Sequence, residues 1–285
     1  MFHGLSAFPL TPLDEDGVDT AAYAALVARL ADARVDSIGA LGSTGSYAYL
    51  TREQRAHAAK IAVDAADGVP VMVGIGALRT AHVLALAEDA QNAGASAVLL
   101  APMTYQPLTD DEVFGLYEDV TRELSVPLCV YDNPATTRVR FGDELHGRIG
   151  QLPNVGSVKI PGEGAGERIG ALRRLLPASV TVGVSGDWTA ARGLNSGANV
   201  WYSVLGGLFP RTALEIARDP AGELSGRLEP LWALFRRHGS LRVVSAAASH
   251  LGLVRERNLP RPLRELGPAH RREVVAVLDS LGLDG

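Results

Sequence analysis

The chain alternates short, continuously apolar runs with longer segments in which apolar residues recur at helical spacing. Eight apolar runs precede a change of pattern near Pro210 and predict strands at residues 5–10, 37–41, 71–75, 97–101, 127–131, 155–160, 181–184 and 199–204. Helices are predicted between them, for example at residues 20–33, 52–66, 80–92, 110–124 and 167–175. Strands that are apolar throughout are typical of a parallel sheet that is buried on both faces.

Residues suited to helix ends support these boundaries. Thr51 and Thr109 each precede a segment with acidic or amide residues in its first turn, as expected of N-caps. Gly94 and Gly197 stand where helices should stop. Eight successive β/α units favour a closed (β/α)8 TIM barrel over an open, doubly wound sheet.

Beyond the eighth strand the pattern is helical only. Residues 1–210 are therefore predicted to form the barrel core, and residues 211–285 a C-terminal helical extension packed on it within one domain. The extension is expected to hold helices at residues 211–217, 223–238, 241–251 and 269–281. Prolines in this part punctuate loops and mark no flexible linker.

Composition narrows the class of protein. The 285 residues are 47% hydrophobic and carry a net charge of −5 without a basic run, so neither nucleic acid nor an anionic membrane is an expected partner. The single cysteine, Cys129, excludes an intramolecular disulfide and fits a reducing compartment. The N-terminus shows no export signal and no run of eighteen apolar residues occurs, so we expect a cytoplasmic protein.

The positions of the only two lysines are informative. Lys60 lies in a predicted amphipathic helix, where a solvated surface role is expected. Lys159 lies inside the sixth predicted strand, where burial disfavours the ammonium form and lowers the pKa. A neutral amine is the nucleophile that Schiff-base enzymes need. The alternative is a lysine at a strand end that pairs with a carboxylate.

Other reactive residues follow the strand ends that converge on one face of a barrel, where active sites are built. The second strand ends in Gly42-Ser43-Thr44-Gly45, whose backbone N–H groups and hydroxyls suit a carboxylate. Tyr131 ends the fifth strand, Ser185-Gly186-Asp187 the seventh, and Ser203-Val204 the eighth. Taken singly, the glycine turn could merely redirect the chain, and Tyr131 could be an ordinary half-buried aromatic residue.

In these motifs together the chain resembles the dihydrodipicolinate synthase and N-acetylneuraminate lyase family of pyruvate-dependent class I aldolases. The resemblance implies that Lys159 forms an iminium with pyruvate or a related 2-oxo acid, that Ser43 and Thr44 hold its carboxylate, and that Tyr131, bonded to Ser43, moves protons. Further substrate contacts are implied for the residues at the other strand ends: Thr136, Gly186, Ser203 and Val204.

The family's second relay tyrosine comes from a neighbouring subunit, which implies a homodimer or homotetramer. Either Thr104 or Tyr105 aligns with it, and we favour Tyr105, which stands 26 residues before Tyr131. The chain also departs from the family pattern. Thr136 replaces the arginine that binds the carboxylate of aspartate semialdehyde, with Arg138 two positions later, and Ser46 replaces an acidic residue after the glycine turn.

The sequence thus predicts a Schiff-base lyase or aldolase that is not a true dihydrodipicolinate synthase. Two alternatives remain: a 2-keto-3-deoxy sugar acid dehydratase of the same family, and a barrel that binds a small molecule without turnover. No metal is expected, because the seven histidines form no set at the barrel mouth; His238, His250 and His270 fall in the extension. No cofactor is expected, because no dinucleotide fingerprint follows the first strand.

Overall fold

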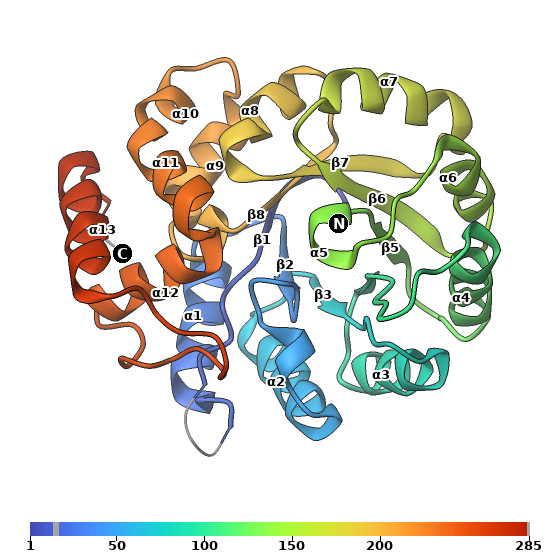
Figure 1. The fold of residues 1–285 in the computed structure, drawn as a ribbon, viewed down its shortest axis with the longest axis horizontal. Helices are drawn as coiled ribbons and strands as arrows, with labels where there is room; N and C mark the ends of the chain where they lie inside the picture. The colour runs from blue at the N-terminus through green and yellow to red at the C-terminus, as the bar shows by residue number, and fades with distance from the viewer. Residues whose placement is uncertain (14–16, 284–285) are drawn as a thin grey trace.

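The computed structural model describes residues 1–13 and 17–283, and in it eight parallel strands close into a barrel in chain order (Figure 1). The predicted TIM barrel is therefore confirmed. Each predicted strand is present, with bounds that differ by up to three residues. The strands are β1 (Gly4–Ala7), β2 (Ser37–Ala40), β3 (Val71–Gly74), β4 (Ala97–Leu100), β5 (Leu128–Tyr131), β6 (Val155–Pro161), β7 (Thr181–Ser185) and β8 (Val200–Ser203).

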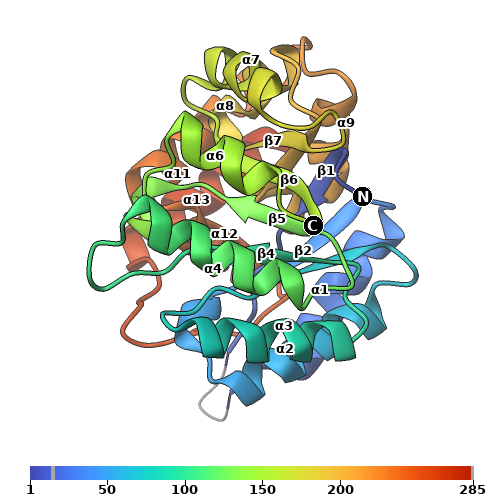
Figure 2. The ribbon, with the colours of Figure 1, turned by 90° about the vertical axis from the view of Figure 1, so that its right-hand side faces the viewer.

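Helices surround the barrel, and Figure 2 shows α2, α3, α4 and α6 side by side across the outside of the strands. Within the first 200 residues they are α1 (Thr20–Asp32), α2 (Arg52–Ala65), α3 (Thr80–Asn92), α4 (Asp110–Arg122), α5 (Pro134–Thr137), α6 (Asp143–Gly150), α7 (Ala165–Leu175) and α8 (Asp187–Asn195). The sequence pattern gave no bounds for α5, α6 and α8, which are short, although Gly197 marked the place where α8 ends.

The predicted helix ends have a direct structural basis. Thr51 accepts a hydrogen bond from the Gln54 N–H at 3.2 Å, and the Gln54 side chain accepts from the Thr51 N–H at 3.0 Å. This reciprocal pair satisfies two otherwise unpaired donors at the start of α2. A second capping box opens α4 at Thr109. Gly94 and Gly197 have φ angles of 91° and 95°, in the region that glycine adopts most easily.

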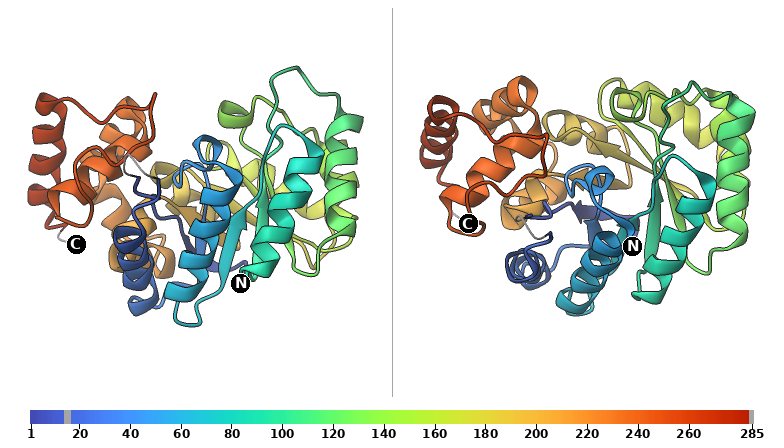
Figure 3. Two further views of the ribbon diagram at one scale, coloured as in Figure 1. Left: turned by 90° about the horizontal axis from the view of Figure 1, so that it is seen from below. Right: turned by 60° about the horizontal axis from the view of Figure 1, so that its bottom comes forward.

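The C-terminal helices gather on one side of the barrel (Figure 3). They are α9 (Pro210–Arg218), α10 (Leu224–Arg227), α11 (Glu229–His238), α12 (Ser240–His250) and α13 (Pro268–Leu281). The prediction of one helix at residues 223–238 is wrong, because two helices, α10 and α11, occupy this range. It divides at Leu228 because Pro230 has no N–H to donate to Gly226 and its ring clashes with that carbonyl group.

α9 packs against β1 and completes the outer layer of helices. The boundary predicted at residue 210 coincides with the first residue of α9.

Cys129 is buried in β5, and burial raises the pKa of its thiol to about 11. An inert thiol is the result. Within the described ranges, none of the helices has both the length and the apolarity that a membrane crossing requires.

Candidate active site

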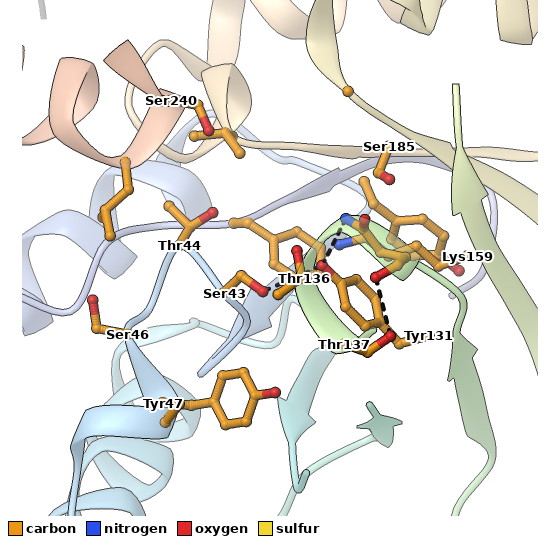
Figure 4. A pocket seen from close by; sticks show the side chains of 18 of the residues that line it. Ser43, Thr44, Ser46, Tyr47, Tyr131, Thr136, Thr137, Lys159, Ser185 and Ser240 are labelled. Atoms are coloured by element: carbon orange, nitrogen blue, oxygen red, sulfur yellow. Dashed lines mark hydrogen bonds between the residues drawn. The ribbon is translucent and has the colours of Figure 1, made fainter. Parts of the chain in front are cut away.

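A cavity of about 550 Å³ opens at the carboxyl ends of the strands, where a barrel places its active site (Figure 4). It brings together most of the residues that the sequence singles out. The predicted site residues that line the cavity are Ser43, Thr44, Tyr131, Thr136, Lys159, Gly186 and Val204.

Lys159 lies on β6 and is only 7% exposed. Its Nζ lies 4.0 Å from the centre of the Phe8 ring, 4.8 Å from that of Tyr131 and 5.3 Å from that of Tyr202. No carboxylate among the described residues forms an ion pair with this amine within 4.0 Å. Burial therefore dominates and lowers the pKa of Lys159 from its ordinary value of 10.5. The alternative role of Lys159, a strand-end lysine paired with a carboxylate, therefore finds no partner among the described residues.

Tyr131 faces Lys159 because the two residues are direct neighbours in the register of β5 and β6. The Tyr131 hydroxyl lies 3.2 Å from the Ser43 hydroxyl, and it accepts a hydrogen bond from Asn133 Nδ2, also at 3.2 Å. Since Asn133 supplies a donor, the Tyr131 proton is free to point at Ser43 or at a bound substrate. The predicted hydroxyl pair is thus present, and Figure 4 shows it beside Lys159.

The turn that carries Ser43 and Thr44 is held by its backbone. Leu41, the residue after β2, adopts a φ of 55°, which is uncommon for a side chain of its size. Its carbonyl oxygen approaches β3 so closely that a Cβ on Gly74 would lie 1.9 Å from it. The local strain persists because β3 packs against the turn, a pattern that clusters at functional sites.

Asp187 is a cavity residue that the predicted site set does not include. It follows β7 and accepts hydrogen bonds from Trp201 Nε1 at 2.9 Å and from the backbone N–H groups of Val204 at 3.2 Å and Leu205 at 2.8 Å. Burial raises the pKa of Asp187 to about 6. Its carboxylate fixes the segment after β8 against the cavity. Its place in the strand-end motif Ser185-Gly186-Asp187 was the sequence feature that could have identified Asp187 as a site residue.

Two predicted residues lie elsewhere. Ser203 is fully buried, and its hydroxyl accepts from the Gly206 N–H at 2.8 Å, so it shapes the turn after β8 and does not line the cavity. Tyr105 is 89% exposed and also lies outside the cavity lining. Its neighbour Thr104 does line the cavity. Within one chain only Thr104 reaches the site, and Tyr105 could serve only the site of another copy.

Hydroxyl groups and one cation surround the outer part of the cavity. Thr136 lies on α5, and Arg138 follows α5 with a φ of 60°; both line the cavity and are exposed. Ser240, the first residue of α12, lines the opposite wall in Figure 4. The rim therefore offers several neutral hydroxyl donors and one arginine.

A buried polar pair supports the end of β5 from behind. Asp132 points away from the cavity side chain of Tyr131, as strand alternation requires. Its carboxylate lies 2.9 Å from Nε2 of His146 on α6, and both side chains are buried. The His146 ring also stacks on Phe141, with ring centres 5.0 Å apart. The pair supports the segment that carries Tyr131, and no sequence pattern indicates it, because 14 residues separate its members.

Fold and cavity together define the class of protein: a (β/α)8 barrel built around a buried lysine on its sixth strand, as in the pyruvate-dependent aldolases and lyases. The model of the dihydrodipicolinate synthetase family matches residues 1–281. The chain belongs to this family, as its sequence motifs predict.

Individual relatives agree along the whole chain. The crystal structure of dihydrodipicolinate synthase from Agrobacterium tumefaciens has a TM-score of 0.95 at 44% identity and covers 98% of both chains. Dihydrodipicolinate synthase from Aquifex aeolicus has a TM-score of 0.92 at 25% identity and covers 99% of each. The 4-hydroxy-tetrahydrodipicolinate synthase of Phenylobacterium zucineum is 29% identical over 99% of this chain and 98% of its own length.

Proposed function

We propose that this protein is a class I lyase or aldolase in which Lys159 forms a Schiff base with pyruvate or another small 2-oxo acid. The observation that carries the proposal is the placement of Lys159: a buried amine of lowered pKa, enclosed by aromatic rings that include that of Tyr131. A structural lysine would need a carboxylate partner, whereas a nucleophilic lysine needs the neutral state that burial favours.

The chemistry follows from this arrangement. The neutral Nζ attacks the ketone carbon of the 2-oxo acid, and the carbinolamine loses water to give an iminium. The iminium nitrogen then accepts the electron pair released at the neighbouring carbon when a carbon–carbon bond breaks or a proton leaves. Tyr131 exchanges protons with the reacting groups, and Ser43 shares its hydrogen bond. We assign the substrate carboxylate to the Ser43-Thr44 turn, which lines the same cavity as Lys159.

Borohydride trapping tests the proposal. Sodium borohydride with pyruvate is expected to add one reduced pyruvyl group to Lys159, because the iminium is the easily reduced bond that this mechanism forms. Peptide mass mapping locates the adduct, and Lys159→Arg should remove it. Lys60, which is exposed and paired with Asp64, is the internal control. An adduct on Lys60, or none with any 2-oxo acid tried, would reject the proposal.

A dehydratase acting on 2-keto-3-deoxy sugar acids is the second candidate, favoured by the hydroxyl-rich rim. Thr136 and Ser240 line the cavity and can bond the hydroxyls of a sugar chain, and Ser185, whose own proton goes to the Ile160 carbonyl, can still accept a hydrogen bond. Dehydration starts from the same iminium, loses a proton from one carbon and a hydroxyl from the next, and releases water. Product analysis with a sugar-acid panel separates the candidates. An adduct without aldehyde release or water loss would instead favour a non-catalytic binding barrel.

We expect aspartate semialdehyde to be a poor second substrate, although the similar proteins bear the names of dihydrodipicolinate synthases. At Thr136 a substrate carboxylate would find a hydroxyl in place of a charge-assisted, bidentate arginine contact. Loss of such a contact costs about 1.5–3 kcal/mol, or roughly ten- to a hundredfold in binding. A coupled assay comparing this aldehyde with neutral and hydroxylated aldehydes measures the preference.

Arg138 also lines the cavity and could bind the carboxylate of aspartate semialdehyde in place of the missing arginine, which would contradict this expectation. Efficient condensation with aspartate semialdehyde that is lost in Arg138→Ala would show that Arg138 binds the carboxylate. The matched control is Arg140→Ala, since Arg140 lies on the same segment but lines a different cavity.

We further propose a homodimer or homotetramer in which Tyr105 completes the site of a neighbouring copy. The support is its 89% exposure beside the cavity-lining Thr104. Tyr105→Phe should lower activity without changing the oligomer, and dilution of the wild type below the dissociation constant of the oligomer should lower its activity. Light scattering at assay concentration makes the comparison. A fully active monomer would remove Tyr105 from the mechanism.

A further inference from the structure

Three potential metal ligands meet in the C-terminal helices, at residues that do not line the active-site cavity. His238 is the last residue of α11, and His270 and Glu273 lie in the first turns of α13. α11 and α13 pack against one another, and Figure 1 shows them side by side. One ligand atom from each of the three side chains lies within 4.8 Å of the other two.

The separations that join Glu273 to the two histidines are close to those between the ligands of a coordinated ion. Zn²⁺ with bonds of about 2.0–2.2 Å in tetrahedral geometry holds its ligand atoms about 3.4 Å apart. Here Glu273 Oε2 lies 3.6 Å from His270 Nδ1 and 4.0 Å from His238 Nε2. The His270 and Glu273 side chains are 54% and 39% exposed, so they can make the small remaining adjustment.

A cation already bridges two of these ligands, His238 and Glu273. The Arg237 Nε donates to His238 Nε2 at 2.9 Å, and another nitrogen of the same guanidinium donates to Glu273 Oε1. His238 Nε2 therefore presents a lone pair, and positive charge is favoured at this point. The Arg237 side chain is 53% exposed and can swing into solvent when an ion replaces it.

We propose that His238, His270 and Glu273 form a binding site for Zn²⁺, with water completing the coordination. Two imidazole nitrogens and one carboxylate are donors that zinc prefers, whereas Mg²⁺ and Ca²⁺ prefer oxygen ligands. The ion ties the end of α11 to the start of α13. His238 directly precedes Gly239, Ser240 and Leu241, which line the active-site cavity. The bound ion thereby fixes the corner that supports one wall of the active site.

Calorimetric titration of the untagged, chelator-treated protein with zinc chloride at about pH 7.5 tests the site, since histidine is neutral there. The wild type should bind one equivalent of zinc. Glu273→Gln and His270→Ala should each weaken binding by about tenfold or more. Arg237→Ala should tighten it, because the competing guanidinium is removed. The matched control is Arg236→Ala, whose side chain pairs with Glu229 instead and whose loss should leave zinc affinity unchanged.

Thermal unfolding gives a second readout. Zinc should raise the Tm of the wild type and of Arg237→Ala, and at the same zinc concentration it should raise that of Glu273→Gln by much less. Zinc affinity that falls in Arg237→Ala, or that is unchanged in Glu273→Gln, would overturn the proposal. Equal binding of magnesium chloride in the same titration would overturn it as well.

Discussion

Lys159→Met is expected to abolish turnover and, at the same time, to stabilise the folded protein at neutral pH. Without the amine no iminium can form, so kcat should fall by at least about a thousandfold. Met has a similar length and suits the aromatic surroundings of Phe8, Tyr131 and Tyr202. Removing a buried polar group that lacks a compensating partner should raise the free energy of unfolding by about 1–3 kcal/mol.

This gain in stability should depend on pH. Burial lowers the pKa of Lys159 in the folded state below its ordinary value of 10.5. Well below the folded pKa both states hold the proton, so the wild type bears the full cost of burying an ammonium ion. As pH rises toward 10.5, the folded state loses its proton first and the wild type becomes relatively more stable. The advantage of Lys159→Met should therefore be largest below the folded pKa of Lys159 and shrink steadily as pH rises toward 10.5.

Urea unfolding of both proteins at several pH values measures the difference. Lys60→Met is the control, because Lys60 is a surface residue in an i,i+4 ion pair with Asp64. It should change the free energy of unfolding by no more than about 0.5 kcal/mol and leave turnover intact. A Lys159→Met protein that is less stable than the wild type at neutral pH would show that this amine has a structural partner.

The sequence was most informative where local chemistry and strand alternation act together. Lys159 could be recognised because an ammonium group inside an apolar strand conflicts with its surroundings unless it has a function. Tyr131 could be placed beside it because parallel strands in a barrel bring their ends together. Capping boxes at Thr51 and Thr109 marked helix starts for equally local reasons.

Contacts between distant residues could not be predicted in the same way. Phe8, directly after β1, and Tyr202 on β8 enclose Lys159. Nothing in the sequence around either aromatic residue indicates this contact with the lysine. Ser203 was expected in the cavity because it ends the eighth strand, but the neighbouring Tyr202 lines the cavity and adjacent side chains of a strand point to opposite faces. The site thus depends on register and closure of the barrel, which a sequence pattern defines only in outline.

The Tyr131 hydroxyl should carry the second-largest effect. Tyr131→Phe keeps the ring that packs 4.8 Å from Lys159 Nζ but removes the oxygen bonded to Ser43 and Asn133. Loss of a general acid–base group lowers kcat by about 10²–10⁴-fold. Lys159 retains its environment, so borohydride with pyruvate should still yield the Lys159 adduct. Tyr131→Phe should therefore lose turnover but keep the borohydride adduct, whereas Lys159→Met should lose both.

Ser43→Ala tests whether the two hydroxyls act as a unit. Tyr131 would keep the Asn133 hydrogen bond, so the single change should cost less than Tyr131→Phe. If protons pass between the two hydroxyls, adding Ser43→Ala to Tyr131→Phe should cost less than it does in the wild type, because the relay is already broken. Tyr49→Phe, at an exposed position on the cavity rim, is the control and should stay within about twofold of the wild type. Strictly additive losses would mean that Ser43 binds substrate independently, and full activity in Tyr131→Phe would mean that another group moves the proton.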